Sequence, residues 1–158
     1  MIKQIDTIIE EYISEISKTN KVVGCFICGS YINGGYNNES DIDTLFLVKN
    51  SPFEMILEEY KNILFDKLVV DPELLLDILL NESPLSNILS LSLGSKQKIV
   101  IDSKHIASII EQAKNNIQNR SLIYIKKNKT KKVVDGNSYT VKKIDSIYRL
   151  VRNNQMVI

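Results

Sequence analysis

The sequence contains no tryptophan, one histidine and two cysteines among its 158 residues. It also lacks an apolar run near the roughly 18 residues that span a bilayer. The stretch Met1 to Lys18 carries four acidic residues, unlike a signal peptide. These absences predict a cytoplasmic protein that does not enter a membrane.

The two cysteines, Cys25 and Cys28, lie in an apolar stretch that is expected to be a strand. Residues three apart in a strand point to opposite faces, so these thiols cannot bridge. No second cysteine pair exists and His105 is the only histidine, which disfavours zinc and redox chemistry. We expect two buried, reduced thiols.

The chain length and a composition of 44% hydrophobic and 25% charged residues predict one compact core without room for a second full domain. Charge divides this chain into a core over 1–113, with nine basic and seventeen acidic residues, and an extension over 114–158, with eleven basic and two acidic residues. The extension is either a solvated surface or a contact surface for a polyanion or an acidic partner.

Hydrophobic periodicity predicts a mixed order of helices and strands. Helices are expected over 1–20, from Ser51-Pro52 to before Asn62, over Leu74 to Leu80 and Leu85 to Leu93, from Asp102 or Ser103 to Asn119, and over Thr140 to Val151. Strands are expected over Lys21 to Cys28, Ile42 to Val48, Ile63 to Val70 and Lys98 to Ile101, with two further candidates at Leu122 to Lys126 and Lys132 to Val134. This order predicts an α/β (α+β) fold, a central mixed β-sheet with flanking helices.

The most informative stretch joins Gly29-Ser30 to Asp41-Ile42-Asp43 across ten residues. Asp41 and Asp43 are two apart at the start of a strand, so both carboxylates leave the same face of the sheet. Two neighbouring anions repel unless a cation lies between them, and Mg²⁺ prefers such oxygen ligands. Gly29 lets a phosphate approach the backbone, and Ser30 offers a hydroxyl and an amide near a helix start. The pattern predicts a site for Mg²⁺ and a triphosphate.

A third acid is expected beside this pair, as an oxygen ligand or as a base for an attacking hydroxyl. Asp66 interrupts an apolar strand, where a carboxylate is costly unless it is paired, exposed or bound to a metal. Asp71 is the rival, although its position before Pro72 favours a helix cap. Tyr31 and Tyr36 could stack on a base or simply cover the core.

The joined pattern resembles the signature of the polymerase-beta-like nucleotidyltransferase superfamily, from about Lys21 to Ala113. Its nearest likeness is to the small bacterial minimal nucleotidyltransferases (MNT). The resemblance implies a two-metal Mg²⁺ site, an NTP substrate expected to be ATP, and transfer of a nucleotide to a hydroxyl.

The resemblance assigns phosphate binding to Gly29 and Ser30, and metal binding and catalysis to Asp41 and Asp43. Asp66 takes the same role as the third acid. Two positions depart from the family pattern: Asn33 stands where small members often have arginine, and Thr44 where leucine is usual.

The acceptor stays open among several classes. By its size the chain resembles MNT-type antitoxins, which transfer AMP from ATP to a tyrosine hydroxyl of a partner toxin, so a protein docked by the basic extension is the first hypothesis. An aminoglycoside or lincosamide adenylyltransferase, an RNA 3′-end nucleotidyltransferase that binds through the extension, and a non-catalytic antitoxin or binding module are the alternatives.

Overall fold

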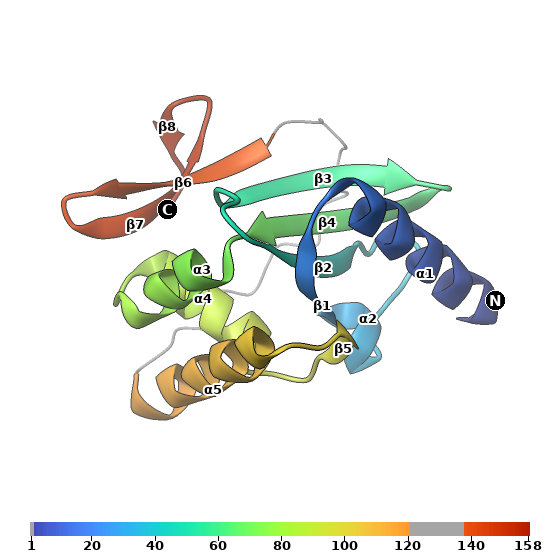
Figure 1. Cartoon of the computed structure of the whole chain (residues 1–158), viewed down its shortest axis with the longest axis horizontal. Helices are drawn as coiled ribbons and strands as arrows, with labels where there is room; N and C mark the ends of the chain where they lie inside the picture. The colour runs from blue at the N-terminus through green and yellow to red at the C-terminus, as the bar shows by residue number, and fades with distance from the viewer. Residues whose placement is uncertain (1, 121–137) are drawn as a thin grey trace.

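A computed structural model of the chain describes residues 2–120 and 138–158 (Figure 1). Its helices are α1 (Ile2–Thr19), α2 (Ser30–Asn33), α3 (Pro72–Leu80), α4 (Pro84–Leu93) and α5 (Lys104–Asn119). Its strands are β1 (Val22–Cys28), β2 (Ile42–Val48), β3 (Glu54–Tyr60), β4 (Ile63–Val70), β5 (Lys98–Ile101), β6 (Ser138–Ile144), β7 (Ile147–Arg152) and β8 (Gln155–Met156). The candidate strands Leu122 to Lys126 and Lys132 to Val134 lie outside the described residues.

The eight described strands form one sheet in the order β5-β1-β2-β4-β3-β6-β7-β8. Within it β2 and β4 are parallel, and the other described pairs are antiparallel. Helix α1 packs on one face of this sheet, while α3, α4 and α5 gather on the other (Figure 1). The predicted α+β fold with a mixed sheet is therefore confirmed.

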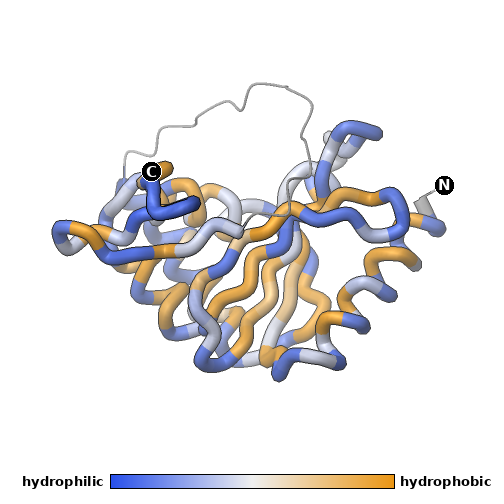
Figure 2. Tube along the Cα trace, turned by 90° about the horizontal axis from the view of Figure 1, so that it is seen from above, coloured by the Kyte–Doolittle hydropathy of each residue, from blue (hydrophilic) through white to orange (hydrophobic). Residues whose placement is uncertain are grey.

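The central strands are buried on both faces because their side chains alternate between two apolar clusters. Phe26, Leu45 and Leu47 belong to the cluster beneath α3, α4 and α5. Ile27 and Phe46 belong to the cluster beneath α1. Figure 2 shows the result as hydrophobic strands in the middle of the molecule and more polar segments toward its ends.

The helix predicted from Ser51-Pro52 to before Asn62 is wrong, because this segment forms β3. Its strand pairs antiparallel with β4 through a two-residue turn at Lys61 and Asn62, both with positive φ (47° and 64°). Two successive left-handed residues are typical of the type I′ turns that match the twist of paired strands. The sheet pairing, rather than the helical spacing of apolar residues, decides the structure here.

The helix predicted over Thr140 to Val151 is also wrong, because the segment forms the β6–β7 hairpin. Its turn lies at Asp145 and Ser146, again with positive φ (52° and 65°). β6 pairs with β3, where Tyr139 lies opposite Met55, so it covers an edge that β3 would otherwise leave open. The other predicted helices and strands within the described residues are confirmed.

The segment on either side of residue 113 belongs to one continuous helix, α5. Beyond it, β6, β7 and β8 extend the same sheet that carries β1 to β4. None of the helices in the described ranges 2–120 and 138–158 has the length and apolar character needed to cross a membrane.

Candidate active site

Three carboxylates meet at one end of the sheet. Asp41 directly precedes β2, Asp43 lies in β2, and Asp66 lies in β4 at the position paired with Asp43 in the parallel register. One carboxylate oxygen from each residue lies within 4.8 Å of the others. Asp41 is 6% exposed, whereas Asp43 and Asp66 are half-buried. The two acids of the sequence motif and the predicted third acid thus form one cluster.

The strand period explains why these acids share a face. Asp43 is followed on the same face by Leu45 and Leu47, and Asp66 by Leu68 and Val70. All four of these apolar residues are buried in the cluster beneath α3, α4 and α5. Each strand therefore offers a carboxylate where it begins, and apolar side chains where the helices cover it.

Gly29 holds a conformation that a side chain would disturb. It follows β1, with φ 75° and ψ −157°, and Cys28 before it pairs with Asp43. A Cβ at this position would lie 1.9 Å from Oδ2 of Asp43. The missing side chain that was predicted to admit a phosphate therefore also makes room for a carboxylate of the cluster.

The connection between Ser30 and Asp41 is a compact loop. Ser30 begins the short helix α2, which ends at Gly34 with φ 84°, and the amide of Gly35 donates to the Ser30 carbonyl at 3.0 Å. Further along, the Glu39 amide donates to Oδ1 of Asn37 at 2.9 Å. These turns bring the chain back to the acids, so that Gly29 and Asp41 border the same site.

Tyr31 and Tyr36 pack against the apolar cluster beneath α1. Their rings meet edge to face with centroids 5.3 Å apart, and the Tyr31 hydroxyl donates to Asp6 of α1. Burial, and then the negative charge of Asp41, raise the pKa of the Tyr36 hydroxyl. Both rings are partly buried, which favours the interpretation that they cover the core.

Asp71, the rival third acid, lies at the far end of β4 from the cluster. Its carboxylate accepts hydrogen bonds from the amides of Asn50 at 2.6 Å, Glu73 at 2.8 Å and Leu74 at 3.2 Å. Burial alone would raise the pKa of Asp71, but these amides lower it below its usual value. Asp71 therefore caps α3, as its position before Pro72 predicts.

Both cysteines are buried thiols of β1, and Cys28 lies opposite Asp43 in the pairing of β1 with β2. Cys25 and Cys28 are buried and not joined in a disulfide. Burial raises the pKa of the Cys25 thiol to about 12, which leaves it protonated and unreactive at neutral pH. The predicted buried thiols are confirmed.

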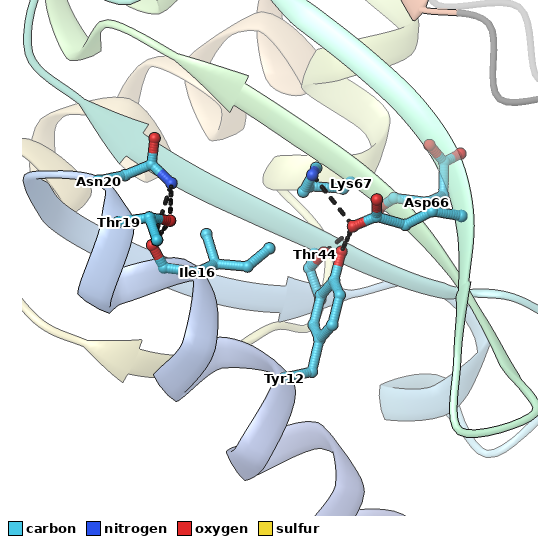
Figure 3. Close-up of polar contacts among 8 residues, drawn as sticks. Tyr12, Ile16, Thr19, Asn20, Thr44, Asp66 and Lys67 are labelled. Atoms are coloured by element: carbon cyan, nitrogen blue, oxygen red, sulfur yellow. Dashed lines mark hydrogen bonds and ion pairs between the residues drawn. The ribbon is translucent and has the colours of Figure 1, made fainter.

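Among the side chains behind the acids, the sequence singled out Thr44 only as a departure from the family pattern, and it did not assign Tyr12 or Lys67 to the site. Thr44, between Asp43 and the apolar end of β2, is 2% exposed and directs its hydroxyl to the carbonyl oxygen of Asp66 at 3.5 Å. Tyr12 and Lys67 lie on the same side of the sheet (Figure 3). Lys67 also gives a signal in the sequence, because a cation beside an acid in an apolar strand requires a partner of its own.

The cluster suits a hard divalent cation. Three oxygen donors on rigid strands are the ligands that Mg²⁺ takes up, and a cation among them would relieve their mutual repulsion. The fold and this site together are suited to phosphoryl or nucleotidyl transfer, in which the three acids could hold a metal ion.

Comparison with protein families leads to the same class. A family model described as a nucleotidyltransferase domain matches residues 8–132. The chain belongs to this family, which is part of the polymerase-beta-like superfamily, and has the nucleotidyltransferase activity of that family. The match begins within α1 and includes all of α5, and so reaches further than the resemblance seen from the sequence motif. Comparison with curated proteins gives no match.

Proposed function

We propose that this nucleotidyltransferase uses Mg²⁺ to transfer AMP from ATP to a hydroxyl of a partner protein, in the manner of MNT-type antitoxins. The observation that carries the proposal is the cluster of three carboxylates, Asp41, Asp43 and Asp66, with oxygens within 4.8 Å of one another. The cluster lies beside Gly29-Ser30, so the phosphates of a nucleotide bound at these two residues would lie next to a metal held by the acids.

Each residue has a chemical role in this proposal. Asp41 and Asp43 hold the metal, and Asp66 acts as third ligand and as acceptor for the proton of the attacking hydroxyl. Gly29 and Ser30 bind the phosphates. Mg²⁺, when bound, supplies charge stabilisation to the transferred phosphoryl group. The acceptor oxygen forms a bond to the α-phosphorus of ATP. The bond between the α-phosphorus and the oxygen that bridges it to the β-phosphate breaks, and pyrophosphate leaves.

The protein acceptor is supported by the charge of the extension, which has eleven basic and two acidic residues over 114–158. After α5, the described part of the chain adds the strands β6, β7 and β8 to the sheet. Strands β6 and β7 carry four positively charged residues: Lys142, Lys143, Arg149 and Arg152. We propose that 1–113 is the catalytic core and that 114–158 is an extension that docks the acceptor.

The test is a labelling experiment with the purified protein, ATP, Mg²⁺ and lysate of a bacterium that lacks the gene. We expect one added AMP on a single protein, seen by intact mass, together with pyrophosphate release. Asp43→Asn is the matched control, because it keeps the size of the side chain but removes the charge. No adenylylated protein with the wild-type enzyme would contradict the protein acceptor.

The same reaction separates the alternatives. Label on RNA 3′ ends, with binding that weakens steeply as salt rises, would show an RNA acceptor. Label on an aminoglycoside or a lincosamide would show an antibiotic acceptor. Neutralisation of a toxin by Asp41→Asn and Asp43→Asn variants as strong as by the wild type would show a non-catalytic module.

A further inference from the structure

The two neighbours of Asp66 in sequence are both held from the opposite face of the sheet. Phe65 is fully buried beneath α1, and the Tyr12 ring stacks on it with centroids 3.8 Å apart and planes inclined by 17°. Figure 3 shows Tyr12 rising from α1 toward the strands that carry Thr44, Asp66 and Lys67. The aromatic contact therefore fixes β4 one residue before the third acid.

Lys67 is fixed on the other side of Asp66. Its Nζ lies 3.0 Å from Oε1 of Glu58, and the same oxygen accepts the Tyr12 hydroxyl at 2.6 Å. Glu58 stands opposite Phe65 in the antiparallel register of β3 and β4. Oε1 of Glu58 on β3 thus links Tyr12 of α1 to Lys67 of β4, the residue that follows the third acid.

Thr44 adds a contact from the neighbouring strand. Its hydroxyl donates to the Asp66 carbonyl oxygen at 3.5 Å, across the parallel pair in which Thr44 lies opposite Lys67. Tyr12 and Thr44 are 3% and 2% exposed, so both are removed from solvent. The backbone at Asp66 is consequently restrained on each side and across to β2.

Such a polar group of residues is not needed for stability alone. Burying charged and hydroxyl groups costs free energy that their bonds only partly return, and an apolar core of the same shape is often as stable. What polar contacts supply is fixed geometry, since each partner must keep its direction as well as its distance. The geometry fixed here is that of a carboxylate repelled by two others.

We infer that Tyr12, Glu58, Lys67 and Thr44 form a positioning network that holds Asp66 within reach of the metal shared with Asp41 and Asp43. The inference rests on the proposed function, in which Asp66 is a metal ligand. Tyr12, Glu58 and Lys67 meet on the α1 side of the sheet, whereas strand alternation puts the Asp66 side chain on the opposite face, so the members of the network are positioning residues rather than catalytic ones.

The first test is Tyr12→Phe, which keeps the stacked ring and removes only the hydroxyl. Tyr60→Phe is the matched control, because Tyr60 also donates to an α1 glutamate, Glu15, at 3.0 Å, but at the end of β3. Mn²⁺ affinity is measured by electron paramagnetic resonance without nucleotide, alongside kcat and KM for ATP. We expect Tyr12→Phe to weaken Mn²⁺ binding by about 10-fold or more and to lower kcat with KM unchanged, as loss of supporting hydrogen bonds does at other metal sites. Tyr60→Phe should change neither.

The second test uses the charge of Lys67. By Coulomb's law alone, removing a cation near three acids strengthens the binding of a dication. If the network positions Asp66, Lys67→Met instead weakens Mn²⁺ binding, and this opposite sign separates geometry from charge. Tighter Mn²⁺ binding by Lys67→Met, or equal Mn²⁺ affinity in Tyr12→Phe and Tyr60→Phe, would overturn the inference.

Asp66→Asn distinguishes this failure from failure of the proposed function. If Asp66→Asn binds Mn²⁺ and transfers nucleotide as the wild type does, then Asp66 is no ligand and both ideas fall. If Asp66→Asn loses both properties while Tyr12→Phe and Lys67→Met keep them, then only the positioning network is wrong. Thermal melting of every variant identifies any loss that reflects unfolding, and Lys67→Met carries the test should Tyr12→Phe fail to fold.

Discussion

Replacing Gly29 by alanine is expected to damage the metal site more than the fold. The new Cβ would stand 1.9 Å from Oδ2 and 2.9 Å from Cγ of Asp43, far inside normal contact distance. Since the backbone of β2 is held by the core, the Asp43 carboxylate must move by roughly 1 Å or more, and a displacement of that size can lower a rate by about 100-fold.

The stability cost comes from the backbone. Gly29 has φ 75° and ψ −157°, a region that is essentially confined to glycine, and an L-residue there costs about 1–3 kcal/mol. In a chain of this size each kcal/mol lowers the melting temperature by about 2–4 °C. The Gly29→Ala protein should therefore remain folded at 25 °C, with weak Mn²⁺ binding and little pyrophosphate release.

Gly34→Ala supplies the control for this prediction. Gly34 also has positive φ, 84°, but a Cβ there would meet nothing within 4 Å. Its variant pays a comparable backbone cost of about 1–2 kcal/mol without moving a carboxylate. We expect it to keep its Mn²⁺ affinity and pyrophosphate release. Equal losses of activity in the two variants, or full activity in Gly29→Ala, would refute the role given to the space beside Asp43.

Three further predictions concern charge and burial. Asp43→Asn should abolish nucleotide transfer while its melting temperature without metal stays equal or rises, since a repulsive charge is removed; a fall would show that the carboxylate stabilises the fold. Asp71→Ala should cost about 0.5–2 kcal/mol at pH 7 in urea denaturation. Because the pKa of Asp71 is lowered in the folded state, its contribution is complete above the usual value of 3.8 and is lost as pH falls below it, so the two unfolding curves should converge in acid. Cys25, with its pKa raised to about 12, should react with a thiol reagent only as the protein unfolds, which mass spectrometry of native and urea-treated samples can check.

The acids of the motif could be predicted because their geometry is local. Asp41 and Asp43 need only the two-residue period of a strand to share a face. Asp66 could be proposed from its cost in an apolar strand, but its nearness to Asp43 depends on the parallel register of β2 and β4. That register is set by tertiary packing, with β3 placed on the outer side of β4, and no short stretch of sequence records it.

The two helices that were predicted wrongly show where the pairing of strands overrides the local spacing of apolar residues. In the β6–β7 hairpin, Val141, Ile144, Ile147 and Val151 suit a helical spacing as well as a strand. The structure is decided by the left-handed turn at Asp145 and Ser146, a pair without the glycine that usually marks such turns, and by the open edge of β3. β3 itself was missed for the same reason, since its turn at Lys61 and Asn62 also lacks glycine.

Strands β2 and β4 place the acids of the candidate site and the apolar residues that stabilise the fold at different positions along the same strands. On one face of β2 and β4, the residues after Asp43 and Asp66 are apolar and lie beneath α3, α4 and α5, so the acids can be changed without opening the core. On the other face, Tyr12 and Glu58 hold the same strand from behind. A helix that precedes the nucleotide motif in sequence therefore has a reason to belong to the catalytic unit. The family match likewise begins at residue 8, within α1, rather than at β1.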